Sequence, residues 1–355
     1  MIRIFLFALF GLALGATHAQ QEIHPKVDYF GYVEGYYAYD FNEPFDHIRQ
    51  PFLFNYNRHN TFSVNQAVFS LKIDGGFYRG NVGFQAGTYP QDNFGETEDL
   101  LQHIFQANVG VSLNEKRTLW VDAGIYPSHL GYESSIGIEN YTLTRSLAAE
   151  NSPYFLAGVK MTYTPDEHWT LMATINNGWQ RISREPGNQF PGMGTMVEYQ
   201  NGDHLIHWGT LVSNSYPEAI KRIRFFNDLF YRWKVNEKLT ITNLFDLGVE
   251  EKGNGESGSS AWFTYHIAGT YHWRDRWKLG FRFEVYQSDD PVVSIDQLGD
   301  GPQLVGGSAN IDFQVNRFFI FRFEPRYLYG NDSFVRGSEV VSSDLTLTTS
   351  MAVRF

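Results

Sequence analysis

Apolar and polar residues alternate along most of the chain with a period of two. Sixteen runs of about ten residues show this pattern, which is typical of strands with one apolar and one polar face. A tilted transmembrane strand needs about 9–11 residues, so each run has the length of one bilayer crossing. The runs are 29–40, 62–73, 77–89, 102–113, 117–126, 154–164, 168–180, 191–200, 204–213, 222–235, 239–250, 260–272, 276–287, 303–315, 318–330 and 342–355.

The connections between these runs alternate in length without a break. Seven are short, and most have the residues of tight turns: Asp74-Gly75-Gly76, Asn114-Glu115-Lys116, Pro165-Asp166-Glu167, Asn201-Gly202-Asp203, Asn236-Glu237-Lys238, Arg274-Asp275 and Asn316-Arg317. Eight are longer: 41–61, 90–101, 127–153, 181–190, 214–221, 251–259, 288–302 and 331–341. Short periplasmic turns and long external loops distinguish outer-membrane barrels. We therefore predict an all-β fold: a closed antiparallel transmembrane β-barrel of sixteen strands, with fourteen or eighteen as alternatives.

Aromatic residues lie at many of the predicted strand ends, where a barrel places its interfacial girdles. The residues suited to this role are Tyr37, Tyr39, Trp169, Tyr231, Trp233, Tyr271, Trp273, Trp277 and Tyr329. The strands of a soluble β-sandwich would also show alternating apolar and polar residues. That fold does not explain why short and long connections alternate along the chain, or why aromatic residues lie at strand ends. Closure of the barrel pairs every strand edge, so no backbone group need be left unsatisfied in lipid.

Composition agrees with a barrel. Aromatics make up 17% of the chain, and the mean hydropathy is −0.33. Alternating lipid-facing and lumen-facing residues produce such a mean, and no apolar run near 20 residues follows the N-terminal region. The absence of cysteine excludes disulfides and thiolate metal sites, and no cofactor or metal is predicted.

The N-terminal residues have the pattern of a secretory signal peptide. Arg3 is followed by the apolar run 4–14, and Thr17 and Ala19 stand at the positions preferred before a cleavage site. We predict cleavage of residues 1–19 and one barrel domain over 20–355, exported to the outer membrane of a Gram-negative bacterium. Cleavage removes one base from 28 and none of the 39 acids, giving 27 − 39 = −12. Such a charge argues against nucleic-acid binding.

The alternation also predicts which charges face the lumen, since an Arg or Lys facing lipid at midplane costs about 2–4 kcal/mol. The predicted lumen wall comprises Glu34, Arg79, Arg222, Arg224, Asp228, Arg232, Arg282, Glu284, Arg322, Glu324 and Arg326, with Lys72, Lys160 and Asp246 on the same faces. The bases gather in the tenth, thirteenth and fifteenth runs. Two roles stay open for them: ion selectivity, or ion pairing that stiffens the wall.

The connection 127–153 follows the fifth run and is the longest interval without strand pattern. In general porins the loop at this place folds inward and narrows the pore. Our hypothesis is that residues 127–153 form the constriction, with the loop's acids facing the basic strands. Its charged residues are Glu133, Glu139, Arg145 and Glu150. The alternative is a loop outside the barrel rim.

Several sequence motifs resemble the Bacteroidetes-type outer-membrane barrels of the putative beta-barrel porin-2, OmpL-like family. They are Tyr32-Val-Glu34-Gly-Tyr36 with Tyr39-Asp40, Asn57-Arg58-His59-Asn60-Thr-Phe62 leading to Val64-Asn65-Gln-Ala67, Gly131-Tyr-Glu133, and Asn140-Tyr141-Thr-Leu-Thr144-Arg145-Ser146. The resemblance implies a porin-like protein of the outer membrane. Phe355 also looks like the signal that barrel-assembly machinery recognises on a last strand.

Passive diffusion of small hydrophilic solutes is the leading functional hypothesis, since it needs only pore width and charge. A surface adhesin or a barrel subunit of a larger complex is the alternative. An outer-membrane hydrolase is less well supported, because no G-x-S-x-G motif accompanies His129, His204, His207, His266 and His272. The acids of the long loops match no defined Ca²⁺ cage, and whether they bind Ca²⁺ stays open. The solute and the oligomeric state, including a homo-oligomer, stay open.

Overall fold

The computed structural model describes residues 24–355 apart from 51, 95–99 and 290–302, so the predicted signal peptide and the acids Glu96, Glu98, Asp99, Asp290, Asp296 and Asp300 lie outside the described residues. The strands are β1 (Lys26–Asp40), β2 (Thr61–Asp74), β3 (Tyr78–Ala86), β4 (Ile104–Ser112), β5 (Leu119–Pro127), β6 (Phe155–Tyr163), β7 (Trp169–Asn176), β8 (Gly192–Asn201), β9 (His204–Asn214), β10 (Ile223–Lys234), β11 (Leu239–Glu251), β12 (Ser259–Arg274), β13 (Trp277–Ser288), β14 (Gln303–Gln314), β15 (Phe319–Arg336) and β16 (Glu339–Arg354).

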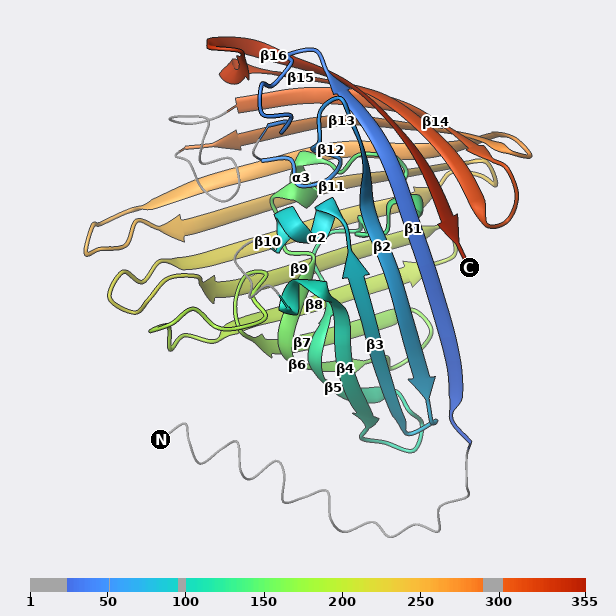
Figure 1. Cartoon of the computed structure of the whole chain (residues 1–355). Helices are drawn as coiled ribbons and strands as arrows, with labels where there is room; N and C mark the ends of the chain where they lie inside the picture. Colours follow the sequence, from blue (N-terminus) through green and yellow to red (C-terminus); the bar gives the residue numbers. More distant parts are fainter. Residues whose placement is uncertain (1–23, 51, 95–99, 290–302) are drawn as a thin grey trace.

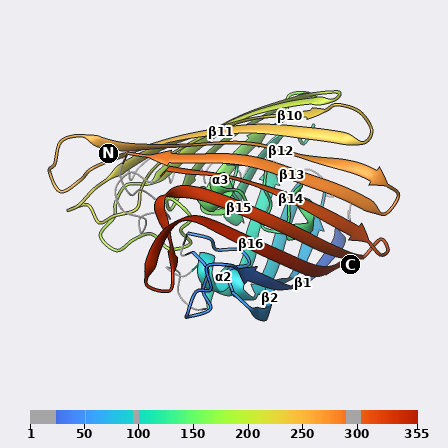
Figure 2. The same ribbon diagram turned by 90° about the horizontal axis from the view of Figure 1, so that it is seen from above.

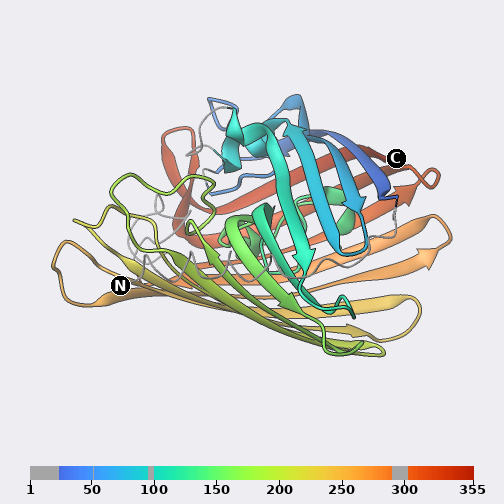
Figure 3. The same ribbon diagram turned by 90° about the horizontal axis from the view of Figure 1, so that it is seen from below.

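Each strand pairs antiparallel with its neighbours in sequence, and β1 pairs with β16 to close the barrel. In the closing pair Tyr32 lies opposite Arg354 and Asp40 lies opposite Thr346. The backbone groups of Gly31 and Phe355 exchange two further hydrogen bonds of 2.8 and 3.0 Å. Figures 1 and 3 show the resulting ring of strands. The predicted sixteen-stranded barrel is therefore confirmed.

The predicted runs coincide with the strands to within a few residues, except at one loop. The prediction of a long connection at 331–341 was wrong: β15 continues to Arg336, β16 begins at Glu339, and Phe334 pairs with Val341. The polar residues after Tyr329 mark a register irregularity in the hairpin, not its turn. The turn itself lies at Gly337, whose φ of 61° is readily adopted by glycine.

The burial pattern separates two faces of each strand. In β16, Thr346, Thr348 and Ser350 are each 1% exposed, whereas the alternate residues Leu345 and Met351 are 38% and 52% exposed. The polar set therefore faces inward, and the apolar set faces the surface that meets lipid. Trp169, Trp233 and Trp273, near the short turns, are also exposed on the outer face, as an interfacial girdle requires.

Short helices occur in the connections at the long-loop end. They are α2 (Thr88–Asn93), η2 (Leu101–His103), η3 (Gly137–Glu139) and α3 (Leu147–Glu150). Among the described residues, none of the helices is both long and apolar enough to cross a bilayer. The last two belong to the connection between β5 and β6, and α3 lies within the ring of strands (Figure 2).

Candidate functional site

The connection 127–153, which we name loop 3, lies against the inner face of the barrel. His207 of β9 is hydrogen bonded through Nε2 to the carbonyl oxygen of His129 at 2.9 Å, and Tyr132 contacts His266 of β12 at 2.8 Å. Further along, the loop meets β1, where a Cβ atom on Gly137 would lie 2.6 Å from both Glu34 Oε2 and Tyr56 Oη. Glycine at this position therefore permits the close approach of loop and wall.

Arg322 of β15 holds the middle of loop 3. Its guanidinium donates to the carbonyl oxygens of Gly137 at 2.7 Å and Asn140 at 3.1 Å, and to Asp312 of β14 at 2.9 Å. The side chain is completely buried. The planar guanidinium group has several N–H donors, so one charged group satisfies two loop carbonyls and a carboxylate together.

Arg282 and Glu324 hold the next turn of loop 3 through Thr144. Arg282 Nη1 donates to the Thr144 carbonyl at 2.6 Å, and Glu324 accepts from the Thr144 backbone nitrogen at 2.8 Å. Glu284 accepts from the Leu147 nitrogen at 2.7 Å and from Arg326 at 3.0 Å. These wall charges are buried and are satisfied by one another and by the loop backbone. Charges neutralised in this way form an interface and project little field into a pore.

The charged residues of loop 3 make their contacts elsewhere. Glu133 accepts from the backbone nitrogen of Ser146 at 3.1 Å and from its hydroxyl. Glu139 is paired with Arg354 of β16 at 3.4 Å. Arg145 is fully buried and donates to the carbonyl of Ser135 at 2.7 Å. The contacts of these three residues thus lie within the loop and at β16, away from the basic tenth strand.

Glu150 joins loop 3 to the first long connection, 41–61, which we name loop 1. Its carboxylate accepts from the backbone nitrogen of Phe54 at 3.2 Å and from Asn55 at 3.4 Å. Burial raises the pKa of Glu150 to about 7, although these two donors and Arg145 oppose the shift. The carboxyl therefore titrates near neutral pH at the contact between the two loops.

Loop 1 was expected as an ordinary external loop, but part of it packs inside the barrel. Phe52 and Leu53 are fully buried, and Tyr56 donates to Glu34 of β1 at 2.8 Å. The apolar run Phe52-Leu53-Phe54 was the available signal for this packing. Sequence reasoning therefore missed the contribution of loop 1 to the lumen.

The long-loop half of the lumen contains a hydrophobic cluster. Residues of eight wall strands meet Phe52, Leu53, Leu130 and Leu147 of loops 1 and 3. The wall members are Tyr126, Leu156, Leu211, Phe226, Trp262, Tyr286, Leu304, Leu328 and Phe334. This part of the lumen is therefore packed, because the loops supply apolar partners that the strand pattern alone does not reveal.

Four of the remaining predicted wall residues lie in other contacts of the inner face. Arg79 is bound to Asp122 at 2.7 Å, and Arg224 is bound to Glu250 at 2.6 Å. Asp228 lies 3.5 Å from His207, and the guanidinium of Arg232 lies 5.6 Å from the ring centre of Tyr132. Arg222 instead precedes β10, where its side chain is 35% exposed and donates to the carbonyl oxygen of Lys252 at 2.9 Å.

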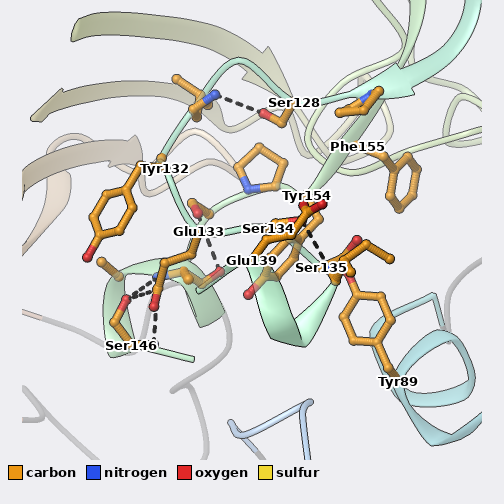
Figure 4. A pocket seen from close by; sticks show the side chains of 18 of the residues that line it. Tyr89, Ser128, Tyr132, Glu133, Ser134, Ser135, Glu139, Ser146, Tyr154 and Phe155 are labelled. Carbon is orange, nitrogen blue, oxygen red and sulfur yellow. Dashed lines mark hydrogen bonds between the residues drawn. The ribbon is translucent and has the colours of Figure 1, made fainter. Parts of the chain in front are cut away.

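A cavity of about 460 Å³ lies beside loop 3. Two of its lining residues, Phe30 and Arg354, belong to the short-turn ends of β1 and β16. Two others, Tyr89 and Phe94, lie near the long-loop end of β3. The lining therefore includes residues from both ends of the barrel wall. Figure 4 shows Tyr132, Glu133 and Ser135 of the loop with Tyr89 and Phe155 around this space.

Four of the histidines considered for a hydrolase, His129, His204, His207 and His266, have structural partners. His129 contacts the Thr210 carbonyl at 2.9 Å, and its burial lowers the pKa to about 4, so it is neutral at pH 7. His204 contacts Tyr231 on the exposed surface at 2.7 Å. The described part of the chain has no group of three or more His, Cys, Asp or Glu residues arranged to hold a metal ion.

Comparison with known proteins identifies a family. Residues 26–355 match the model of the family described as putative beta-barrel porin-2, OmpL-like. No curated protein matches the chain.

Solved structures share the fold at low sequence identity. The anion-selective porin from Comamonas acidovorans is 10% identical, with a TM-score of 0.62 over 93% of this chain and 100% of that chain. The outer membrane channel DcaP of Acinetobacter baumannii is 11% identical, with a TM-score of 0.64 over 95% and 100%. OmpT of Vibrio cholerae, in a trimer form, is 10% identical, with a TM-score of 0.63 over 93% and 99%.

Proposed function

The chain belongs to the putative beta-barrel porin-2, OmpL-like family, and on that premise we propose that loop 3 is the constriction of an outer-membrane channel for passive diffusion. The observation that carries the proposal is the cavity between loop 3 and the wall, whose lining includes residues from both ends of the barrel. Loop 3 covers the inner faces of β13 and β15 through its hydrogen bonds to Arg282, Arg322 and Glu324. Solutes then pass on its other side, along the cavity whose wall residues come from β1, β3–β6, β11 and β16.

The charges around this passage differ from those that the sequence pointed to. The charged lining residues are Glu133, Glu139, Asp246 and Arg354, three acids and one base. The anion-selective porin from Comamonas acidovorans shares the fold, but an excess of acids disfavours anions by direct repulsion. We therefore propose a channel without anion preference, in which the arginines of β13 and β15 anchor the loop.

Thiol modification tests the position of the passage. The chain contains no cysteine, so an engineered thiol is unique. Ser135→Cys places it in the cavity lining. We expect a charged methanethiosulfonate reagent to modify this variant rapidly and to lower its single-channel conductance in planar bilayers, because the added group occupies the passage.

Thr348→Cys is the matched control. Thr348 also faces inward, but it is 1% exposed. This variant is expected to conduct as the unmodified protein does and to react slowly. Rapid modification of the Thr348→Cys thiol with loss of current, or an unreactive Ser135→Cys thiol, would contradict a passage along the cavity.

The two ends of the chain have roles in export and assembly in this proposal. We propose that residues 1–19 are the cleaved signal peptide, that 20–355 form the single barrel domain, and that the barrel-assembly machinery recognises Phe355. The family motifs support an origin among Bacteroidetes. The trimer form of Vibrio cholerae OmpT supports a homo-oligomer in lipid. The family and the fold point to a channel without enzymatic activity.

A further inference from the structure

The start of loop 3 packs closely on two glycines of the barrel wall. A Cβ atom on Gly194 of β8 would lie 2.7 Å from the ring of His129, and one on Gly209 of β9 would lie 2.9 Å from the side chain of Leu130. His129 also donates through Nε2 to the carbonyl oxygen of Thr210 at 2.9 Å. Because glycine leaves room that any side chain would fill, these two positions allow the loop to approach the wall.

His207 of β9 contacts an acceptor with each of its ring nitrogens. Nε2 lies 2.9 Å from the carbonyl oxygen of His129, and Nδ1 lies 3.2 Å from a carboxylate oxygen of Glu198 in β8. Carbonyl and carboxylate oxygens accept hydrogen bonds, whereas a neutral imidazole has a single N–H donor. His207 therefore makes both bonds only as the doubly protonated imidazolium, which has two donors.

The groups packed around His207 are compatible with a positive charge. Oδ1 of the buried Asp228 in β10 lies 3.5 Å from Nε2, and Asp246 of β11 stands opposite Asp228 in the register. Phe230 stacks on the imidazole with ring centres 4.5 Å apart, which is close enough for a cation–π contact. The guanidinium of Arg232 lies 5.8 Å from the centre of the same Phe230 ring. A buried carboxylate needs a nearby cation, so the imidazolium also offsets the charge of Asp228.

Resting on the proposed channel function, we propose that His207 is a positioning residue that holds the start of loop 3 against the wall while its ring is doubly protonated. The docked loop binds this proton, and a released loop does not require it. By linkage, docking is strongest at low pH and weakens as the pH rises through the range of about 5–8 in which histidines titrate. The start of loop 3 then leaves the wall more often, and the passage beside it widens.

Thiol accessibility measures how often the start of loop 3 leaves the wall. Leu130→Cys places a thiol at a position that is 5% exposed, and Ser135→Cys places one in the cavity lining. The ratio of their rates of modification by a methanethiosulfonate reagent corrects for thiol ionisation. We expect this ratio to rise about 10-fold from pH 5 to pH 8, as for the loss of one hydrogen bond to a charged group. Both variants also carry Glu150→Gln, which removes the titration between loops 1 and 3.

Two histidine variants separate the role of His207 from a general effect of pH. His207→Gln keeps a donor but cannot gain a proton, so its ratio should be independent of pH. His204→Gln, at an exposed histidine that contacts Tyr231, should keep the full pH dependence. In nitrogen NMR spectra of histidine-labelled protein, the signals that His207→Gln removes should show two protonated ring nitrogens at pH 5.

A ratio that keeps its pH dependence in His207→Gln, or a His207 ring with one unprotonated nitrogen at pH 5, would overturn the positioning role. If His207→Gln does not fold, Glu198→Gln replaces it, because it keeps an acceptor and removes the charge that stabilises the imidazolium. The ratio should then rise at lower pH, and an unchanged profile would again overturn the role. A folded barrel that shows the pH-dependent ratio but no conductance would overturn the channel function alone.

Discussion

Arg322→Ala is expected to release the middle of loop 3 and to raise the single-channel conductance several-fold. The substitution removes the donors to Gly137, Asn140 and Asp312 together. It leaves a carboxylate and two carbonyls in a buried interface without their cation. Loss of one partner from a buried ion pair costs about 3–5 kcal/mol. We expect new contacts of this part of loop 3 to compensate for only a fraction of that cost. Loop 3 should therefore leave the wall, and the passage should widen.

Planar-bilayer recordings and urea unfolding in detergent measure the two effects. Arg276→Ala removes an exposed arginine from a short turn and should change neither conductance nor stability. Arg322→Lys keeps the charge but loses the forked geometry, so it should give an intermediate conductance. An Arg322→Ala channel with unaltered conductance would show that this anchor does not control the passage.

The contact between loops 1 and 3 is expected to weaken as the pH rises from about 4.5 to about 7, because of Glu150. Burial raises the pKa of this carboxyl from its ordinary value of 4.5 to about 7, so the docked state binds the proton more tightly than the undocked state. The contact between the two loops is therefore most stable below the ordinary pKa of 4.5. It loses stability as the pH rises, until the Glu150 carboxyl of the docked loops has ionised. The difference amounts to about 3 kcal/mol above pH 7.

Hydrogen exchange of the Phe54 amide reports this change, since that amide donates to Glu150. Protection, corrected for intrinsic exchange, should fall over this pH interval and stay constant above it. Glu150→Gln cannot ionise and should show flat protection, while Glu139→Gln, at an exposed ion pair, should keep the pH dependence. A pH dependence that persists in Glu150→Gln would assign the titration to another group.

The strands could be read from the sequence because each is specified locally. In β16 the alternation of Leu345, Thr346, Leu347 and Thr348 matches the observed burial residue by residue. Period two fixes which side chains share a face, and lipid on one side makes the wrong face costly. The one wrong connection, 331–341, lies where polar residues interrupt this pattern within a hairpin.

The role of the wall charges could not be read in the same way. The alternation predicts that Arg282, Arg322 and Glu324 share the inward face of their strands, but it does not say what they meet there. Their partners are backbone atoms of Gly137, Asn140 and Thr144, more than a hundred residues away in sequence. Any residue type presents a carbonyl, so no side-chain motif marks these contacts.

The sequence by itself determined the closed antiparallel barrel and its sixteen strands. Only the tertiary structure decided that loop 3 lies across β13 and β15, that Phe54 of loop 1 donates to Glu150 of loop 3, and that a cavity remains beside loop 3. The physical reason is the distance along the sequence over which each feature is specified. Strand alternation follows from neighbours two residues apart, whereas the path of a loop depends on hydrogen bonds and packing between segments that meet only after the barrel has closed.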